Sequence, residues 1–446
     1  MRYPAPGRAL VATLAAFLRS DADRYLDWLE IRFDELEPGI KAFLPEAGRF
    51  DRLREDLEHL ETRFDSADRR PPLFGLPFGV KDIFHADGFP TRAGSRLPAE
   101  ILRGEQAESV GRLREAGGLI LGKTVTTEFA YFAPGPTENP HQPGHTPGGS
   151  SSGSAAAVAS GLAPVALGTQ TIGSINRPAA FCGTVGFKPS FGRISAQGVI
   201  PLSPSLDQVG YFTVDAGSAA FLAPLLIDDW PLSPAKASPL RLGIPTGPYL
   251  DRAEPAGRAQ FQSVVGELQR AGHATFEIDC MPDFDAITAR HQLILAAECA
   301  RVHSDWFDQY PDRYHPKTAA LIEAGRTISA DDLERALPGR QSLRLYLEGL
   351  MDEHALDAWI TPSAPGPAPF GLDSTGDPVM NLPWTQSGMP TVTLPSGKNA
   401  AGLPFGLQLI ARFWQDAALL ECARSLEPVL DYESMHGMDE FLKDIA

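Results

Sequence analysis

The sequence predicts an α/β fold in which one large unit, and not two separate domains, takes up the chain. The chain has 446 residues, of which 43% are hydrophobic, and this is enough to bury a large core. Strand-like and helix-like segments alternate over residues 240–278. Strand-like segments occur towards both ends of the chain and flank a helical stretch at 286–350, which indicates a single sheet that gathers both ends.

The N-terminal part, residues 1–67, is predicted to be helical. Apolar residues recur at helical spacing in DRYLDWLEIRF and DRLREDLEHLETRF. An apolar run at 9–17 follows two arginines, as in a secretion signal, but no small-residue cleavage site comes after it, so we interpret it as an amphipathic first helix. No apolar run reaches the roughly 18 residues that span a bilayer, and we therefore expect a soluble, cytoplasmic protein.

The remaining elements follow from short apolar runs and from helical periodicity. The predicted strands are 75–80, 118–122, 209–214, 240–244, 273–278, 356–360, 390–394 and 405–410, with a further short apolar run in FCGTVGFKPSFGRIS. The predicted helices are 108–116, 154–161, 256–272, most of 286–350, and 416–426. We expect loops at 132–146 and 168–174, and a connection between two portions of the fold at 231–238.

Charge and composition exclude several classes of function. The chain has 39 basic and 56 acidic residues, and its net charge of −17 opposes binding to nucleic acid or to anionic membranes. The ten histidines form no metal-ligand pattern, so we expect no metal and no cofactor. The four cysteines lack CxxC spacing and are interpreted as buried free thiols of a reducing compartment: Cys182, Cys280, Cys299 and Cys422.

The stretch around which the chain is organised is a tract of small residues at 148–178, GGSSSGSAAAVASGLAPVALGTQTIGSINRP. It contains no charged residue before Arg177, its glycines cluster at the two ends, and its middle is rich in alanine. A solvated linker would be more polar. We therefore predict two loops joined by a buried helix, at a place where the backbone comes close to another group.

Serines in this tract are the candidate nucleophiles. The segment GSSSG matches the GxSxG turn of α/β-hydrolases with Ser151 at its centre, but that turn requires a preceding strand, and the residues before it read PHQPGHTP. Ser174 fits better, because successive backbone N–H groups of the TIGS segment can point at one oxygen, as an oxyanion hole requires.

A serine needs a base before it can attack an amide. Lys81, at the end of the apolar run 75–80, can serve as that base if burial keeps its amine neutral. The alternative is an ordinary surface lysine beside Asp82.

With these residues in place, the sequence resembles the amidase signature family of serine hydrolases. The matching motifs cover nearly the whole chain: GLPFGVKD (75–82), LGKTVTTEFA (121–130), TPGGSSSGSAAAVASG (146–161), GSI (173–175), GFKPSFGRIS (186–195), SLDQVG (205–210) and GLPFGLQLIAR (402–412). The resemblance implies one α/β/α unit with a mixed, twisted sheet of about eleven strands covered by helices.

The resemblance also implies a Ser, cis-Ser and Lys triad. It assigns the nucleophile to Ser174, the proton relay to Ser150 and the base to Lys81, and the interval of 24 residues between the serines (174 − 150) agrees with the family spacing. The backbone N–H groups of Thr171, Ile172, Gly173 and Ser174 are then the oxyanion hole, and water hydrolyses an acyl-enzyme.

The segment around Ser174 departs from the family pattern at three positions. Gln170 replaces an acidic residue, Ile172 replaces a glycine, and Asn176 replaces an arginine, with Arg177 one step later. Ser152 also replaces a glycine. Because Ile172 adds a branched side chain, we predict a reshaped pocket in an enzyme that still hydrolyses its substrate.

The expected activity is hydrolysis of the C–N bond of a small amide with an aryl or alkyl acyl group. Carbamates and esters are alternatives for the same triad. Alternatives of another kind are a subunit of an amidotransferase and a catalytically silent partner subunit. We expect a monomer or homodimer with a small-molecule substrate, pocket walls at 132–145 and 286–350, and carboxylate recognition by Arg177 as a further option. The candidate pocket residues are Tyr131, Phe132, Gln170, Phe370 and Trp384.

Overall fold

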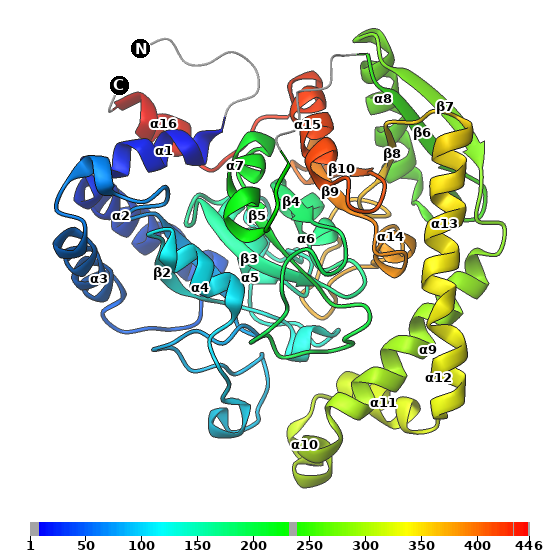
Figure 1. Cartoon of the computed structure of the whole chain (residues 1–446), viewed down its shortest axis with the longest axis horizontal. Coiled ribbons are helices and arrows are strands. Elements are labelled where there is room, and N and C mark those ends of the chain that lie inside the picture. The colour runs from blue at the N-terminus through cyan, green and yellow to red at the C-terminus, as the bar shows by residue number, and fades with distance from the viewer. Residues whose placement is uncertain (1–8, 232–238, 431, 445–446) are drawn as a thin grey trace.

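The computed structural model describes residues 9–231, 239–430 and 432–444. One mixed β-sheet runs through the middle of this part of the chain, with helices on both sides (Figure 1). The prediction of a single α/β sheet that gathers strands from both ends of the chain is therefore confirmed. Except for Pro231, the predicted connection at 231–238 lies outside the described residues.

Ten strands of the described chain form the sheet, close to the eleven that the family resemblance implies. They are β1 (Pro77–Lys81), β2 (Leu119–Thr124), β3 (Val165–Gln170), β4 (Val185–Lys188), β5 (Gln208–Thr213), β6 (Arg241–Thr246), β7 (Ala274–Asp279), β8 (Ala358–Pro362), β9 (Thr391–Lys398) and β10 (Pro404–Ile410). Their order is β2-β1-β3-β5-β4-β9-β10-β8-β6-β7. The pairs at the two ends of the sheet are parallel and the central ones antiparallel.

Strand β3 corrects the sequence prediction, and strand β4 agrees with it. The sequence predicts a loop at 168–174, but residues 168–170 belong to β3, because Gly168, Thr169 and Gln170 pair with residues of β5. Strand β4 is the short apolar run of FCGTVGFKPSFGRIS, and it pairs with both β5 and β9.

The helices agree with the predicted segments and add several short ones. The described α-helices are α1 (Leu10–Leu18), α2 (Ala22–Ile40), α3 (Arg49–Arg63), α4 (Glu108–Glu115), α5 (Ser152–Ala159), α6 (Asn176–Cys182), α7 (Ala216–Leu226), α8 (Pro255–Arg270), α9 (Phe284–Val302), α10 (Ser304–Gln309), α11 (Pro316–Arg326), α12 (Ala330–Ala336), α13 (Pro338–Glu353), α14 (Leu382–Gln386), α15 (Asp416–Leu426) and α16 (Met438–Asp444). Helices α1 and α16 contact each other, so the two ends of the described chain meet (Figure 1).

Helix α5 explains why the tract at 148–178 is made of small residues. Every residue of α5 is buried, and the helix packs on strands β1, β2, β3 and β5. A side chain at Gly153 would collide with the backbone carbonyl of Ala42 and the backbone nitrogen of Val125. The predicted buried helix is thus confirmed, and close backbone approach is the reason for its composition.

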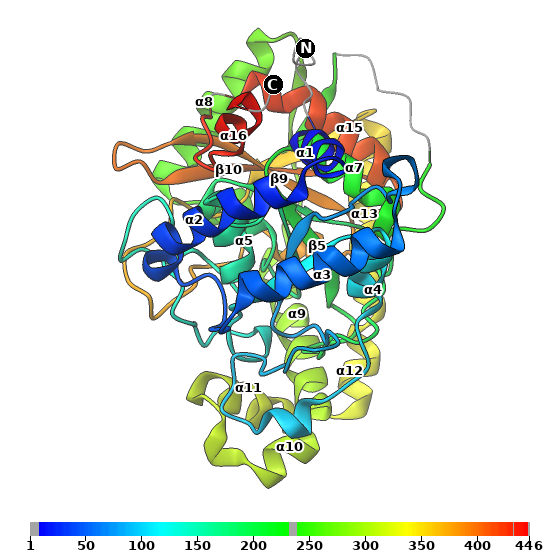
Figure 2. The ribbon, with the colours of Figure 1, turned by 90° about the vertical axis from the view of Figure 1, so that its left-hand side faces the viewer.

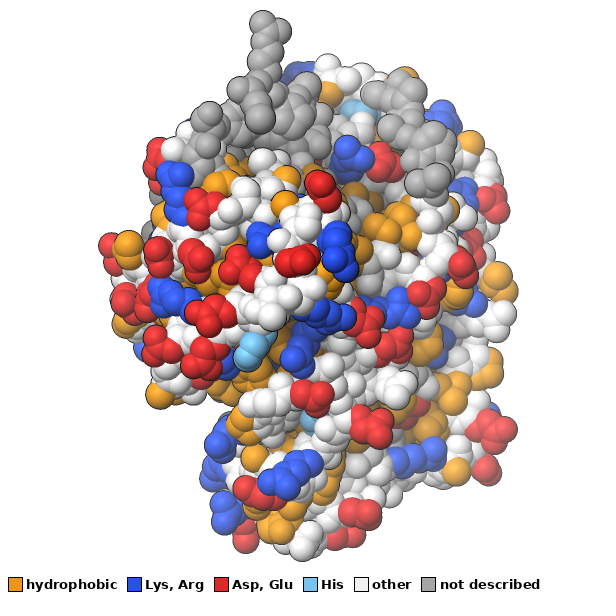
Figure 3. Space-filling view, turned by 60° about the vertical axis from the view of Figure 1, so that its left-hand side comes forward, with side chains coloured by type: hydrophobic (Ala, Val, Ile, Leu, Met, Phe, Trp, Pro, Cys, Tyr) orange, Lys and Arg blue, Asp and Glu red, His pale blue; other side chains and the backbone are white. Residues whose placement is uncertain are grey.

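The helical stretch predicted at 286–350 forms α9 to α13, and its part around α10, α11 and α12 projects from the body of the molecule (Figure 2). Helix α9 packs against α11 and α12 within this projection. On the face shown in Figure 3, acidic and basic side chains are interspersed. No helix of the described residues is long and apolar enough to cross a membrane.

Candidate active site

The parallel pairing of β1 with β3 brings Lys81 to its partners. Lys81 is the last residue of β1, and Val80 lies opposite Leu167 of β3. Since the carboxyl ends of parallel strands meet at the same edge of a sheet, Lys81 reaches Thr169, near the end of β3. Its Nζ is hydrogen bonded to Thr169 Oγ1 at 2.8 Å and to Ser150 Oγ at 2.7 Å.

Lys81 is completely buried, and none of the ion pairs in the described residues involves it. The carboxylate of Asp82 pairs instead with Lys123 Nζ at 2.8 Å. Burial holds the pKa of Lys81 well below its ordinary value of 10.5, against a weaker upward pull from the Asp207 carboxylate. The alternative of a surface lysine beside Asp82 is therefore wrong, and the amine has the environment of a base.

Ser150 and Ser151 stand next to each other just before α5, yet their hydroxyl groups have different surroundings. The Gly149–Ser150 peptide bond is cis, and the Ser150 hydroxyl meets Lys81. The Ser151 hydroxyl donates to the carbonyl of Thr169 at 3.2 Å and accepts from its N–H at 3.3 Å. The Ser151 hydroxyl is therefore engaged in hydrogen bonds to the backbone of β3. In addition, no strand precedes its turn. The structure thus gives the GxSxG alternative no support.

Ser174 lies in the turn between β3 and α6 and is 7% exposed. In the described part of the chain, neither its hydroxyl nor the backbone N–H groups of residues 172–174 donate a hydrogen bond to the protein. A side chain at Gly173 would collide with Asn381 Oδ1, which accounts for a glycine here. Three adjacent N–H groups without an acceptor are what an oxyanion hole requires.

The buried side chain of Gln170 holds this turn in place through hydrogen bonds. Its Oε1 accepts the N–H groups of Ile175 and Asn176 at 2.8 and 2.9 Å. Its Nε2 donates to Asn176 Oδ1 at 2.8 Å and to Thr385 Oγ1 at 2.9 Å. A neutral pair of amides therefore stands where the family pattern has an acid and an arginine, and it holds the start of α6 directly behind Ser174.

The chain is similar to known proteins in both sequence and structure. A family model described as Amidase matches residues 32–420. The chain belongs to the amidase family. A glutamyl-tRNA(Gln) amidotransferase subunit of Synechococcus sp. (strain WH7803) is 30% identical, with 90% of this chain and 92% of the relative covered.

Solved amidase structures share the fold over almost their full length. One, described as the crystal structure of an amidase, is 32% identical with a TM-score of 0.85, covering 95% of this chain and 99% of its own. The peptide amidase PAM in complex with the competitive inhibitor chymostatin is 28% identical with a TM-score of 0.79, covering 94% and 96%. These similarities confirm the family resemblance that the motifs predict.

In this member of the amidase family, the cavity at Ser174 is narrow. Its volume of about 10 Å³ is close to the space of one water molecule. Tyr131, Phe132 and Ile172 line it, so two predicted pocket residues and the branched side chain at 172 lie at the cavity. The other lining residues are Ala130, Thr171, Gly173, Ser174, Arg177, Leu202 and Pro378.

Three predicted pocket residues do not line this cavity. Gln170 is buried beneath the turn, as described above. Trp384 is buried in the core, where its Nε1 donates to the Tyr249 hydroxyl at 2.9 Å. Phe370 is 81% exposed and packs edge-on against the ring of His145. An aromatic side chain fits a core or a surface as well as a pocket, and these two positions correct the prediction.

The helical projection also stays outside the cavity, although the sequence predicts that residues 286–350 form its wall. None of the lining residues comes from this stretch. The projection is instead hydrogen bonded to Glu128, just before Tyr131 and Phe132 in the chain. Glu128 accepts the backbone N–H of His315 at 2.9 Å and the hydroxyl of Thr318 at 2.5 Å, at the start of α11.

Sequence reasoning missed an apolar cavity of about 260 Å³ beside the site. It shares Ala130 and Leu202 with the cavity at Ser174 and also reaches Thr169 and Asp207. Asp207 accepts the Thr171 hydroxyl at 2.6 Å and the N–H groups of Leu202 and Ser203, and burial raises the pKa of this carboxyl to about 6. The SLDQVG motif contains Asp207 and is the signal that could have identified it.

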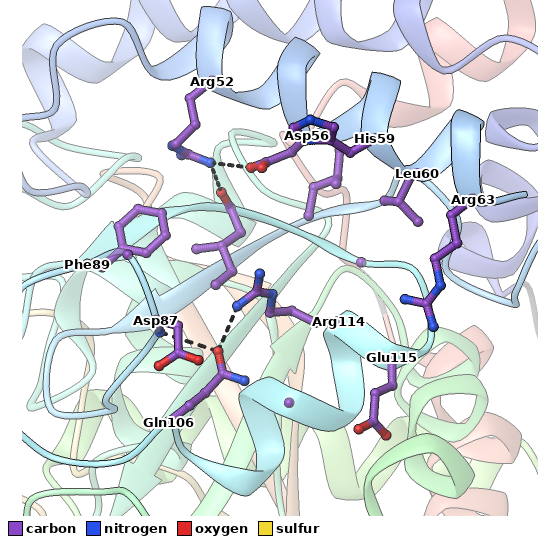
Figure 4. A pocket seen from close by; sticks show the side chains of 15 residues that line it. Arg52, Asp56, His59, Leu60, Arg63, Asp87, Phe89, Gln106, Arg114 and Glu115 are labelled. Carbon is purple, nitrogen blue, oxygen red and sulfur yellow. Dashed lines mark hydrogen bonds and ion pairs between the residues drawn. The ribbon is translucent and has the colours of Figure 1, made fainter.

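A separate cavity of about 520 Å³ lies between α3, α4 and the loop after β1 (Figure 4). It contains none of the serines described above. Its charged residues balance, with three arginines and three acids: Arg52, Arg63, Arg114, Asp56, Asp87 and Glu115. Within the described residues, no group of three or more His, Cys, Asp or Glu side chains is arranged to hold a metal ion.

Proposed function

We propose that this amidase-family enzyme hydrolyses the C–N bond of a small linear amide through an acyl-enzyme on Ser174. The contact of 2.7 Å between Lys81 Nζ and Ser150 Oγ, in a buried setting where none of the described ion pairs involves the lysine, is the observation that carries the proposal. A buried lysine that pairs with no acid is best explained by a neutral amine acting as a base. The substrate is a small molecule with an aryl or alkyl acyl group, and the protein acts in the cytoplasm as a monomer or homodimer.

The chemistry proceeds by proton relay. The neutral Lys81 amine takes the proton of Ser150 while Ser150 takes that of Ser174, and Ser174 Oγ attacks the substrate carbonyl carbon. The N–H groups of the turn at 171–174 bind the oxyanion of the tetrahedral intermediate. Ser150 then returns a proton to the leaving nitrogen, because an amine leaves poorly until it is protonated. Water attacks the resulting ester of Ser174 by the same relay and releases the acid.

A panel of p-nitroanilides, primary amides, carbamates and p-nitrophenyl esters tests this proposal. We expect hydrolysis of amides by the isolated chain and a loss of at least about a thousandfold in the Ser174→Ala variant. Preference for esters or carbamates over amides would replace the amide assignment with one of those classes. The absence of turnover on every substrate, with a folded protein, would favour a catalytically silent partner subunit.

The second candidate is a subunit of an amidotransferase, and the name of the Synechococcus relative favours it. Such a subunit would release ammonia from glutamine for a tRNA-bound acceptor in an assembly. The net charge of −17 speaks against direct tRNA binding by this chain. Glutamine hydrolysis that occurs only with added amidotransferase partner subunits would favour this candidate, whereas unaided hydrolysis of small amides favours the first.

A further inference from the structure

The apolar cavity of about 260 Å³ borders both the nucleophile and the base of the candidate active site. Ala130 and Leu202 line it and also line the cavity at Ser174. Thr169 lines it as well, and the hydroxyl of this residue is hydrogen bonded to Lys81 Nζ at 2.8 Å. A group that occupies the apolar cavity therefore lies next to the reacting groups.

The walls of this cavity suit an apolar ligand. Nine of its twelve lining residues are alanine, valine, isoleucine, leucine or proline. An apolar cavity of about 150 Å³ holds a benzene ring, so this cavity has room for an aryl or a short alkyl group. Two lining residues, Ala196 and Pro204, are exposed, and the cavity can thus be reached from solvent.

Hydrogen bonds hold one wall of the cavity, residues 199–204, in place. The N–H of Ile200 donates to the carbonyl of Ile83 at 2.8 Å. The hydroxyl of Ser203 donates to Glu298 Oε2 at 2.6 Å. The wall is thus fixed to the loop after β1 and to helix α9. The cavity is formed before a ligand enters, as small-molecule sites usually are.

The proposed chemistry determines which part of an amide faces this cavity. The carbonyl oxygen lies at the N–H groups of residues 171–174, and the leaving nitrogen lies at Ser150, which gives it a proton. Ser150 is bonded to Lys81, and Lys81 to Thr169, at 2.7 and 2.8 Å. Two hydrogen bonds therefore connect the place of the leaving nitrogen with the wall of the apolar cavity.

We propose that the apolar cavity binds the substituent on the amide nitrogen, so that the enzyme acts on N-substituted amides of apolar amines in preference to primary amides. This inference rests on the proposed amide hydrolysis at Ser174 and specifies the amine half of its substrate. When the C–N bond breaks, Ser174 keeps the acyl group as an ester. The nitrogen takes the proton of Ser150 and leaves as a neutral amine, whose apolar group the cavity holds.

One charged residue narrows the class of amine. Asp207 is the only charged side chain among the described residues that line the cavity. Its carboxylate accepts hydrogen bonds from the Thr171 hydroxyl and from two backbone N–H groups, which suit an anion. A negative substituent would be repelled at this place. The substituent is therefore neutral or basic.

An acyl group in the same cavity makes the opposite prediction, and a pair of isomers separates the two. N-benzylacetamide carries its ring on the nitrogen side, whereas N-methyl-2-phenylacetamide carries the same ring on the acyl side. With the wild-type enzyme we expect kcat/KM to be at least about tenfold higher for N-benzylacetamide, since an apolar pocket discriminates by about this factor per methylene group. Equal rates, or faster hydrolysis of the phenylacetamide, would overturn the inference and leave the proposed hydrolysis standing.

Variants of Val199, which lines the cavity, locate the effect there. In Val199→Phe the added ring fills space, so we expect kcat/KM for N-benzylacetamide to fall at least about tenfold, through a raised KM, with acetamide changed by less than about threefold. Val199→Ala should extend the preference to N-(naphthylmethyl)acetamide, and it serves as the second variant if phenylalanine does not fit. Val265→Phe, at a partly buried valine of α8 outside the cavity, is the matched control. Equal losses for both amides in Val199→Phe, or an unchanged preference in Val199→Ala, would contradict the proposal.

Binding of the amine product separates this inference from turnover. With Ser174→Ala protein, benzylamine should raise the melting temperature and phenylacetate should not, and the added Val199→Phe change should abolish the rise. A protein that shifts with benzylamine but hydrolyses no amide would overturn the proposed function alone. A protein that hydrolyses amides but neither prefers N-benzylacetamide nor shifts with benzylamine would overturn the assignment of the cavity alone.

Discussion

Lys81 Nζ lies 2.7 Å from Ser150 Oγ, and both residues are almost completely buried. The other hydrogen bond of the amine goes to the hydroxyl of Thr169, so the hydrogen-bond partners of Lys81 are all neutral. Burial without an ion-pair partner favours the unprotonated amine, which has the lone pair that a base needs.

Replacement of Lys81 is expected to separate activity from stability. In Lys81→Met we expect kcat/KM to fall by about 10²–10⁴, the usual contribution of a general base. The free energy of unfolding at pH 7 should fall by no more than about 1–3 kcal/mol, because the change removes two buried hydrogen bonds but no ion pair. Lys81→Arg keeps a cation that does not deprotonate and should be equally inactive. Measured kcat/KM near the wild-type value in Lys81→Arg would exclude the lysine as the base.

Activity should rise with pH as Lys81 loses its proton. Because the pKa of Lys81 lies well below 10.5, the rising limb of the pH profile of kcat/KM should lie at a lower pH than the pKa of a free lysine.

The free energy of unfolding should also rise with pH. The unfolded chain holds the lysine proton up to pH 10.5 and the folded chain does not, so unfolding free energy rises with pH between the two pKa values. A profile of kcat/KM that is flat from about pH 6 to 9 would contradict the role of the lysine.

Gln170 is expected to position the nucleophile turn. In Gln170→Glu the acceptor of the Ile175 and Asn176 N–H groups remains, but the two donors to Asn176 and Thr385 are lost in a fully buried site. We expect a loss of about 1–3 kcal/mol in unfolding free energy, measured by urea denaturation, and slower acylation of Ser174. Gln269→Glu, on the exposed face of α8, is the control and should stay within about 0.5 kcal/mol. An unchanged acylation rate in Gln170→Glu would show that the turn does not depend on this amide.

Ile172 is expected to limit the size of the substrate. Its side chain lines the narrow cavity at Ser174, so Ile172→Ala should widen it. We expect kcat/KM for aryl amides to rise at least about tenfold relative to that for primary alkyl amides, since a pocket discriminates by about this factor per methylene group. If the ratio between the two substrates stays the same, Ile172 does not set the size of the acyl pocket.

Much of the fold follows from apolar runs, and the candidate site follows from the motifs. The run at 75–80 places Lys81 at a strand end, and the tract at 148–178 predicts a buried helix between two loops. The contact of Lys81 with Thr169 could not be predicted, because it depends on the parallel register of β1 and β3. Residues 168–170 contain no β-branched alternation that marks a strand, and pairing with β5 decides their conformation.

The side chains of the pocket are the hardest to predict. Residue type gives no means to distinguish Trp384 in the core and Phe370 on the surface from Tyr131 and Phe132 at the cavity. Gln170 is unusual by its position in the motif, but its role as a support follows only from the four hydrogen bonds that it makes. The triad itself stays a prediction that chemistry has to test.

The most direct test is the site of modification by a fluorophosphonate, located by mass spectrometry of the intact protein and its peptides. We predict a single adduct on Ser174, which is absent in Ser174→Ala, slowed in Ser150→Ala, and retained in Ser151→Ala, because the Ser151 hydroxyl is held by the backbone of Thr169. An adduct on Ser151, or labelling that persists in Ser174→Ala, would contradict the assignment of Ser174 as the nucleophile.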